Sequence, residues 1–168
     1  MKNHTKKPDY ELQINGLVNA VIELLKVEVI DSHCYRNLID NIAAYCVGSI
    51  NSTNKWDSKK LKEHCYWTFA AKNAKITEKE HVIPMSAIVT ILLALDDLSP
   101  NSVKECIKKY AVYCMVTKEE HALLNTKYQR SMPDGFNKEG DKLFGKPFAR
   151  YIDLNIEVDY DYRYIKAG

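Results

Sequence analysis

The stretch YAVYCMVT, from Tyr110 to Thr117, limits what this chain can fold into more than any other feature. It is rich in aromatic and β-branched residues and predicts a strand. The next residues place Glu120 three positions after Thr117, which is the capping-box spacing of a helix start. The sequence therefore predicts a strand that runs directly into a helix, KEEHALLNTKYQR.

Most of the other apolar patterns have the three- and four-residue spacing of amphipathic helices. The helix predicted to begin at Ser58 would turn Leu61, Cys65, Phe69 and Ala70 toward the core. Five helices are predicted in this way: about Asp9 to Val27, Asp31 or Ser32 to Gly48, Ser58 to at least Ala70, Met85 to Leu95, and Asn101 or Ser102 to about Lys109.

Two further segments are predicted to be extended. ITEKEHVIP, from Ile76 to Pro84, combines β-branched residues with a terminal proline, and Tyr151 to Val158 is the extended segment of the tail. The predicted fold class is α+β and mostly helical, with a small β-hairpin and a following helix embedded among N-terminal helices. We expect a single domain over 1–168, made of a helical part (1–75), the hairpin and helix with a helical insertion (76–132), and a loop-rich extension (133–168).

Composition places the chain in a broad class. Hydrophobic residues make up 46% and charged residues 27%, as in an ordinary globular protein, and the net charge of +2 neither indicates nor opposes nucleic-acid binding. The longest apolar stretch, Ile83 to Leu95, is too short to span a bilayer, and MKNHTKKPDYELQ lacks the apolar core of a secretory signal. The five cysteines form no CxxC pair and are interpreted as buried reduced thiols. We therefore expect a cytoplasmic location and no membrane partner.

One acid and imidazole pair, Glu80-His81, lies in the first extended segment, in KEHVIP. A second imidazole, His121, lies on the helix after YAVYCMVT, and Asn125 shares its helical face. A carboxylate and an imidazole can hold one divalent cation while a second imidazole deprotonates a water that attacks a phosphodiester. The carboxylate and both imidazoles are then expected to converge on one cation. The alternative interpretation is that Glu80-His81 is an ordinary solvated polar pair and His121 an exposed residue of a first helical turn.

EHVIP and VTKEEHALLN together resemble the HNH, or ββα-metal, endonucleases. In that family an acid–His or His–His pair sits on the first strand, often with a proline shortly after it. The resemblance implies that His81 is the general base and that Glu80 and His121 are metal ligands. Asn125 matches a position at which some members of the family place a further ligand.

The resemblance covers roughly a third of the chain, about Thr77 to Met132. The separation between the two halves of the motif is longer than in its compact form, and the excess is the helical region from Met85 to Lys109. The middle asparagine of the family has no fixed counterpart. Asn101, Thr117 and Asn125 are the candidates for its place.

The resemblance implies a metal-dependent endonuclease that hydrolyses phosphodiester bonds of nucleic acid, DNA rather than RNA. Oxygen and imidazole ligands favour Mg²⁺, with Mn²⁺ or Zn²⁺ as alternatives. Lys72, Lys75, Lys127 and Arg130 are the predicted contacts to phosphates, although each also fits a solvated helix face. Two other functions stay open: a non-enzymatic helical interaction or regulatory protein of phage or bacterial origin, with the N-terminal helices as a homodimer face, and an RNA-cleaving toxin that uses the same site.

Overall fold

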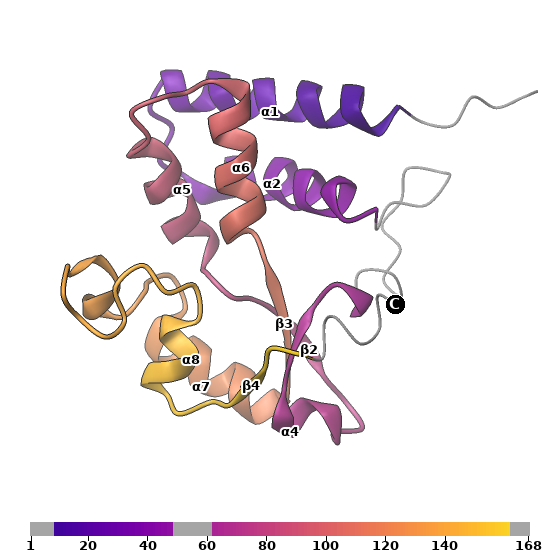
Figure 1. The fold of residues 1–168 in the computed structure, drawn as a ribbon, viewed down its shortest axis with the longest axis vertical. Coiled ribbons are helices and arrows are strands. Elements are labelled where there is room, and N and C mark those ends of the chain that lie inside the picture. The colour runs from indigo at the N-terminus through magenta and orange to yellow at the C-terminus, as the bar shows by residue number, and fades with distance from the viewer. Residues whose placement is uncertain (1–8, 49–61, 162–168) are drawn as a thin grey trace, which may run out of the picture.

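The computed structural model describes residues 9–48 and 62–161 and shows an α+β fold that is mostly helical, as predicted (Figure 1). Its helices are α1 (Tyr10–Lys26), α2 (Ser32–Cys46), α4 (Phe69–Lys72), α5 (Met85–Leu93), α6 (Pro100–Tyr110), α7 (Lys118–Tyr128) and α8 (Ala149–Asp153), with a 3-10 turn at Asp134–Asn137. Its strands are β1 (Tyr66–Thr68), β2 (Glu78–His81), β3 (Tyr113–Val116) and β4 (Val158–Asp159).

Helices α1, α2, α5 and α6 gather on one side of the molecule, and α4, α7 and α8 lie around the strands on the other (Figure 1). The first two helices begin where a side chain can cap them. The carboxylate of Asp9 accepts a hydrogen bond from the backbone N–H of Leu12, and that of Asp31 accepts one from the N–H of His33. Their apolar faces are buried against each other and against α6, so packing rather than helix propensity holds this part together.

The strands form one small sheet in the order β2-β3-β1-β4. The β2 and β3 strands are antiparallel, with Glu80 opposite Cys114 and His81 opposite Tyr113. Directly opposed residues of an antiparallel pair share a face of the sheet. Glu80 and His81 therefore lie on opposite faces, and both lie on β2, which is an edge strand.

Helices α5 and α6 lie between β2 and β3 in the sequence, where a helical insertion was predicted, and the two strands nevertheless pair. Ser99 caps α6, and Pro100 occupies its first turn. Immediately after β3, the capping box of Thr117 and Glu120 starts α7. The chain therefore returns to β2 through two helices and then forms the expected strand-to-helix junction.

Two of the predicted elements are wrong. The third predicted helix is interrupted by β1, in which Thr68 is fully buried, and Phe69 is 50% exposed instead of facing inward. Pairing of β1 with both β3 and β4 outweighs the helical spacing of the apolar residues there. Ser58 and Leu61 lie outside the described residues. The predicted extended segment from Tyr151 begins as helix α8, and only its end enters the sheet, as β4.

The buried apolar side chains, from Ile14 of α1 to Val158 of β4, form one connected core. All five cysteines are free thiols, and Cys65, Cys106 and Cys114 are buried in or beside this core. Cys34 is exposed, contrary to the prediction of buried thiols. None of the helices in the described part of the chain combines the length and the apolar character needed to cross a membrane.

Candidate functional site

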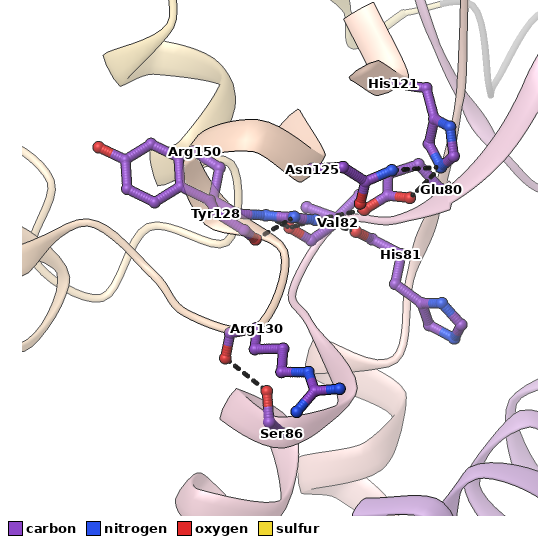
Figure 2. Close-up of polar contacts among 9 residues, drawn as sticks. All are labelled: Glu80, His81, Val82, Ser86, His121, Asn125, Tyr128, Arg130 and Arg150. Carbon is purple, nitrogen blue, oxygen red and sulfur yellow. Dashed lines mark hydrogen bonds and ion pairs between the residues drawn. The ribbon is translucent and has the colours of Figure 1, made fainter. Parts of the chain in front are cut away.

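Glu80 of β2 meets His121 and Asn125 of α7 at one edge of the sheet (Figure 2). Oε2 of Glu80 lies 3.3 Å from Nε2 of His121, and the amide nitrogen of Asn125 lies 3.1 Å from the same ring nitrogen. The side chain of Glu80 is 14% exposed and that of His121 is 36% exposed, so solvent reaches the cluster from the side of α7. The fold thus brings together three of the residues singled out in the sequence.

The start of α7 is held against the sheet by Glu120, the residue before His121. Its Oε2 accepts hydrogen bonds from the backbone N–H of Thr117 at 2.8 Å and from the hydroxyl of Thr68 at 2.7 Å. The first bond belongs to the capping box, and the second ties the helix to β1. Both bonds are part-buried and hold the first turn of α7 against β1, and from there His121 faces β2.

Glu80 is anchored from behind by Arg150 of α8. The guanidinium is fully buried, and its Nη2 lies 3.0 Å from Oε1 of Glu80. Its other N–H groups donate to the carbonyls of His81, Val82 and Tyr128. One carboxylate oxygen is therefore committed to Arg150, and Oε2 is the oxygen that faces His121. Arg150 stands in the loop-rich tail with no motif around it, so no sequence signal marks this contact.

His81 points away from this cluster, toward α2 (Figure 2). Its Nε2 lies 2.8 Å from Oδ1 of Asp40, and the same oxygen accepts a hydrogen bond of 2.7 Å from the hydroxyl of Tyr113. The expectation that the carboxylate and both imidazoles converge is therefore not met. The reason is the strand itself, because successive residues of a strand project to opposite faces.

The polar cluster of Asp40, His81 and Tyr113 has a defined charge state at its centre. Burial on its own raises the pKa of Asp40, but the hydrogen bond and charge of His81 and the hydrogen bond of Tyr113 outweigh it, so the pKa lies below its ordinary value. Burial, together with the Asp40 carboxylate, raises the pKa of Tyr113. At neutral pH Asp40 is thus an anion that accepts hydrogen bonds from the neutral phenol of Tyr113 and from Nε2 of His81. Nδ1, the other ring nitrogen of His81, is not bonded to Asp40.

The predicted phosphate contacts are spread over different surroundings. Lys72 lies 2.5 Å from Asp159, and Lys127 lies 2.8 Å from Asp153, so both ammonium groups already have a carboxylate partner. Lys75 and Arg130 are exposed. The prediction for Lys72 and Lys127 therefore requires that each exchange an ion pair for a phosphate.

The cluster at Glu80 offers a cation three donor atoms of different kinds. Within residues 9–48 and 62–161, no three His, Cys, Asp or Glu side chains gather as a metal-binding group. Glu80 and His121 supply two ligands of these types, and Asn125 adds an amide, whose rotation by half a turn presents Oδ1 in place of the nitrogen. A carboxylate oxygen, an imidazole nitrogen and an amide oxygen suit a divalent ion that keeps several waters.

No family model matches this chain, and neither the curated proteins nor the solved structures contain a match to it.

Proposed function

We propose that the chain is a divalent-metal-dependent hydrolase of phosphodiester bonds. Within that class, an HNH-like endonuclease acting on DNA is the particular activity that we propose. One observation carries the proposal: an antiparallel strand pair is followed directly by a helix, and His121 on that helix lies 3.3 Å from Glu80 on the first strand. Two segments far apart in the sequence thus form a partly exposed site with the ligand types that such chemistry requires.

In this proposal Glu80, His121 and Asn125 hold the cation. When bound, the cation would neutralise charge on the phosphate and stabilise the departing oxygen. Arg150 keeps Glu80 in place through Oε1, so Oε2 stays directed at His121. Mg²⁺ is the proposed ion, with Mn²⁺ or Zn²⁺ as alternatives.

His81 is proposed as the general base, acting from the opposite face of β2. Because β2 is an edge strand of the sheet, no further strand among residues 9–48 and 62–161 covers its outer side. In this proposal a phosphodiester would lie along this edge, with Glu80 on one face of β2 and His81 on the other. Asp40 fixes the imidazole through Nε2, so Nδ1 is the nitrogen that would take the proton from water. Asp40 is thus a positioning residue.

The decisive experiment is cleavage of plasmid DNA by the full chain with Mg²⁺, Mn²⁺, Zn²⁺ or EDTA, with His81→Ala measured beside the native protein. Nicked or linear product that needs a metal and is lost in the variant supports the proposal. Equal activity of the variant rejects the assigned base, and no cleavage by the native protein with any metal rejects the nuclease. Labelled RNA in a parallel reaction separates the DNA endonuclease from an RNA-cleaving toxin.

A non-enzymatic interaction protein is the second candidate, because α1 and the segment after it expose large apolar side chains. Leu12 is 65%, Val27 71% and Ile30 80% exposed. In that case the contacts of Glu80 with Arg150 and of His81 with Asp40 serve only the fold. The mass in solution by light scattering, read together with the cleavage assay, distinguishes the two: a dimer without metal-dependent cleavage favours this candidate.

A further inference from the structure

A hollow of about 560 Å³ lies beside the proposed site, between the start of α2, the start of α5 and the end of α7. Met85 and Ser86, which open α5, line it, and they follow His81 after a short turn. Pockets of about 300 to 1,000 Å³ are typical of sites that hold a ligand. The hollow is therefore large enough for a nucleotide unit. Two of its lining residues follow the end of β2 in the sequence by only a few positions.

The charge of this hollow comes from two arginines. Of the three arginines that the structure describes, Arg150 is buried against Glu80, whereas Arg36 and Arg130 are exposed and both line the hollow. Neither of these two guanidinium groups has a carboxylate partner within residues 9–48 and 62–161. The carboxylate in the lining, Asp31, caps α2 by accepting from the backbone of His33.

Each arginine belongs to a different wall of the hollow. The hydroxyl of Ser86 donates a hydrogen bond of 2.5 Å to the carbonyl of Arg130, which ties the end of α7 to the start of α5 (Figure 2). On the other wall, Arg36 precedes Asp40 by four residues, so the two lie on the same face of α2. The charge of Arg36 reaches Tyr113, where it opposes the rise in the pKa of that phenol. Arg36 is thus a neighbour of the cluster that holds His81.

We propose that this hollow binds the phosphates of the substrate strand next to the bond to be cut, with Arg36 and Arg130 as the paired phosphate ligands. The inference rests on the proposed function and extends it by assigning a path to the DNA strand. That path runs from the edge of β2, past His81, into the hollow. The planar fork of a guanidinium matches two phosphate oxygens at once, which a lysine ammonium does not. Two such forks without carboxylate partners, on two walls of one hollow, form a phosphate clamp.

The test measures binding without cleavage. A fluorescein-labelled DNA duplex of defined sequence is titrated with the full chain in EDTA, at a series of salt concentrations, and the anisotropy gives Kd. For Arg36→Gln/Arg130→Gln we expect Kd to rise roughly tenfold at moderate salt. We also expect the slope of log Kd against log salt to fall by about 2, because roughly one counterion is released for each phosphate contact. Both side chains are exposed, so a thermal melt should show an unchanged fold.

Lys104→Gln/Lys108→Gln is the matched control. It also removes two positive charges, here from α6, where Lys104 is paired with Glu11 and Lys108 with Glu105. Both lysines lie near Cys46 at the far end of α2, where their charges oppose the rise in the pKa of its thiol. The clamp predicts little change in Kd or slope for this variant.

Three results would overturn the clamp. They are an equal loss of affinity in both double variants, no loss of affinity in Arg36→Gln/Arg130→Gln, and no DNA binding by the native chain. If the native chain binds DNA through the two arginines but shows no metal-dependent cleavage, the clamp is upheld and the nuclease is rejected. If the native chain cleaves DNA but Arg36→Gln/Arg130→Gln binds it as tightly as the native chain does, the nuclease is upheld and the clamp is rejected.

Discussion

Nε2 of His81 and Oδ1 of Asp40 lie 2.8 Å apart, across the contact between β2 and α2. Tyr113 of β3 donates to the same carboxylate oxygen at 2.7 Å, so one side chain of the helical part binds two neighbouring strands. The Asp40 side chain is only 16% exposed, so this contact holds α2 against the sheet and is also part of the proposed site. Removing it is therefore expected to change both stability and activity.

Replacing Asp40 by alanine leaves the hydroxyl of Tyr113 and Nε2 of His81 without their shared acceptor. Both groups are largely buried, so we expect the free energy of unfolding at pH 7 to fall by about 1 to 3 kcal/mol. Urea unfolding followed by circular dichroism measures the loss. An unchanged midpoint would show that the contact adds nothing to the fold.

Asp40→Asn, which replaces the carboxylate by a neutral amide, gives a pH dependence with a definite sign. The pKa of Asp40 in the folded chain lies below its ordinary value of 3.8, because the bonds from His81 and Tyr113 outweigh the effect of burial. The carboxylate thus contributes stability that is fully present above that ordinary value and is lost as the pH falls through the lower, folded pKa. The difference in the free energy of unfolding between the native protein and Asp40→Asn should therefore stay constant above pH 3.8 and narrow as the pH falls below it. A difference that stays constant below this pH as well would contradict the assignment.

The separation of His81 from the Glu80 cluster predicts two different kinds of loss. His121→Ala removes a proposed ligand and should weaken Mn²⁺ binding by about tenfold or more. His81→Ala should leave Mn²⁺ binding unchanged, because its ring faces Asp40, while cleavage falls by about 10²- to 10⁴-fold. Isothermal titration with Mn²⁺ and a plasmid assay give the two readouts. If His81→Ala weakens Mn²⁺ binding as much as His121→Ala does, the division of roles is wrong.

The parts of the site that the sequence predicts are those with local signals. The capping box at Thr117 and the β-branched residues of YAVYCMVT mark the junction of β3 and α7, and helical spacing puts His121 and Asn125 on one face. The alternation of strand residues also determines that Glu80 and His81 face opposite ways. That consequence was available in the sequence and contradicts the expectation of convergence.

The remaining parts depend on contacts between segments far apart in the chain. Asp40 looks like any polar residue of an amphipathic helix, and Arg150 like any basic residue of a loop, until the fold brings them to His81 and Glu80. The three-residue strand β1 is a similar case. Its residues fit a helical pattern as well as a strand, and pairing with β3 and β4 decides between the two.

Arg150→Met is expected to be among the most destabilising single changes. The guanidinium is fully buried and binds Glu80 together with carbonyls at the ends of β2 and α7, so methionine would leave several buried acceptors and one charge without a partner. Removing one partner of a buried pair costs about 3 to 5 kcal/mol. Lys127→Met, which breaks the half-exposed ion pair with Asp153, is the control and should leave the urea midpoint nearly unchanged. Similar midpoints for the two variants would mean that Arg150 is not the anchor of Glu80.

Replacement by alanine is expected to change the free energy of unfolding in opposite directions at two glycines, Gly135 and Gly16. Gly135 lies in the turn after α7, and a Cβ built there would come within 3.0 Å of three carboxyl atoms of Asp141. That carboxylate is held by a 2.8 Å hydrogen bond from the backbone N–H of Leu143, so it cannot move aside without losing the bond. We expect Gly135→Ala to lower the free energy of unfolding by about 1 to 3 kcal/mol.

Gly16 lies inside α1, and an added Cβ there meets nothing within 4 Å. Alanine restricts the unfolded chain and suits a helix, so Gly16→Ala should raise the free energy of unfolding by about 0.5 to 1 kcal/mol. Urea unfolding of both variants under one set of conditions compares them directly. Both substitutions add one methyl group. The opposite signs expected for the change in the free energy of unfolding therefore come from the different surroundings of the two glycines. If Gly135→Ala is as stable as Gly16→Ala, then Asp141 does not hold the turn after α7 in the position described.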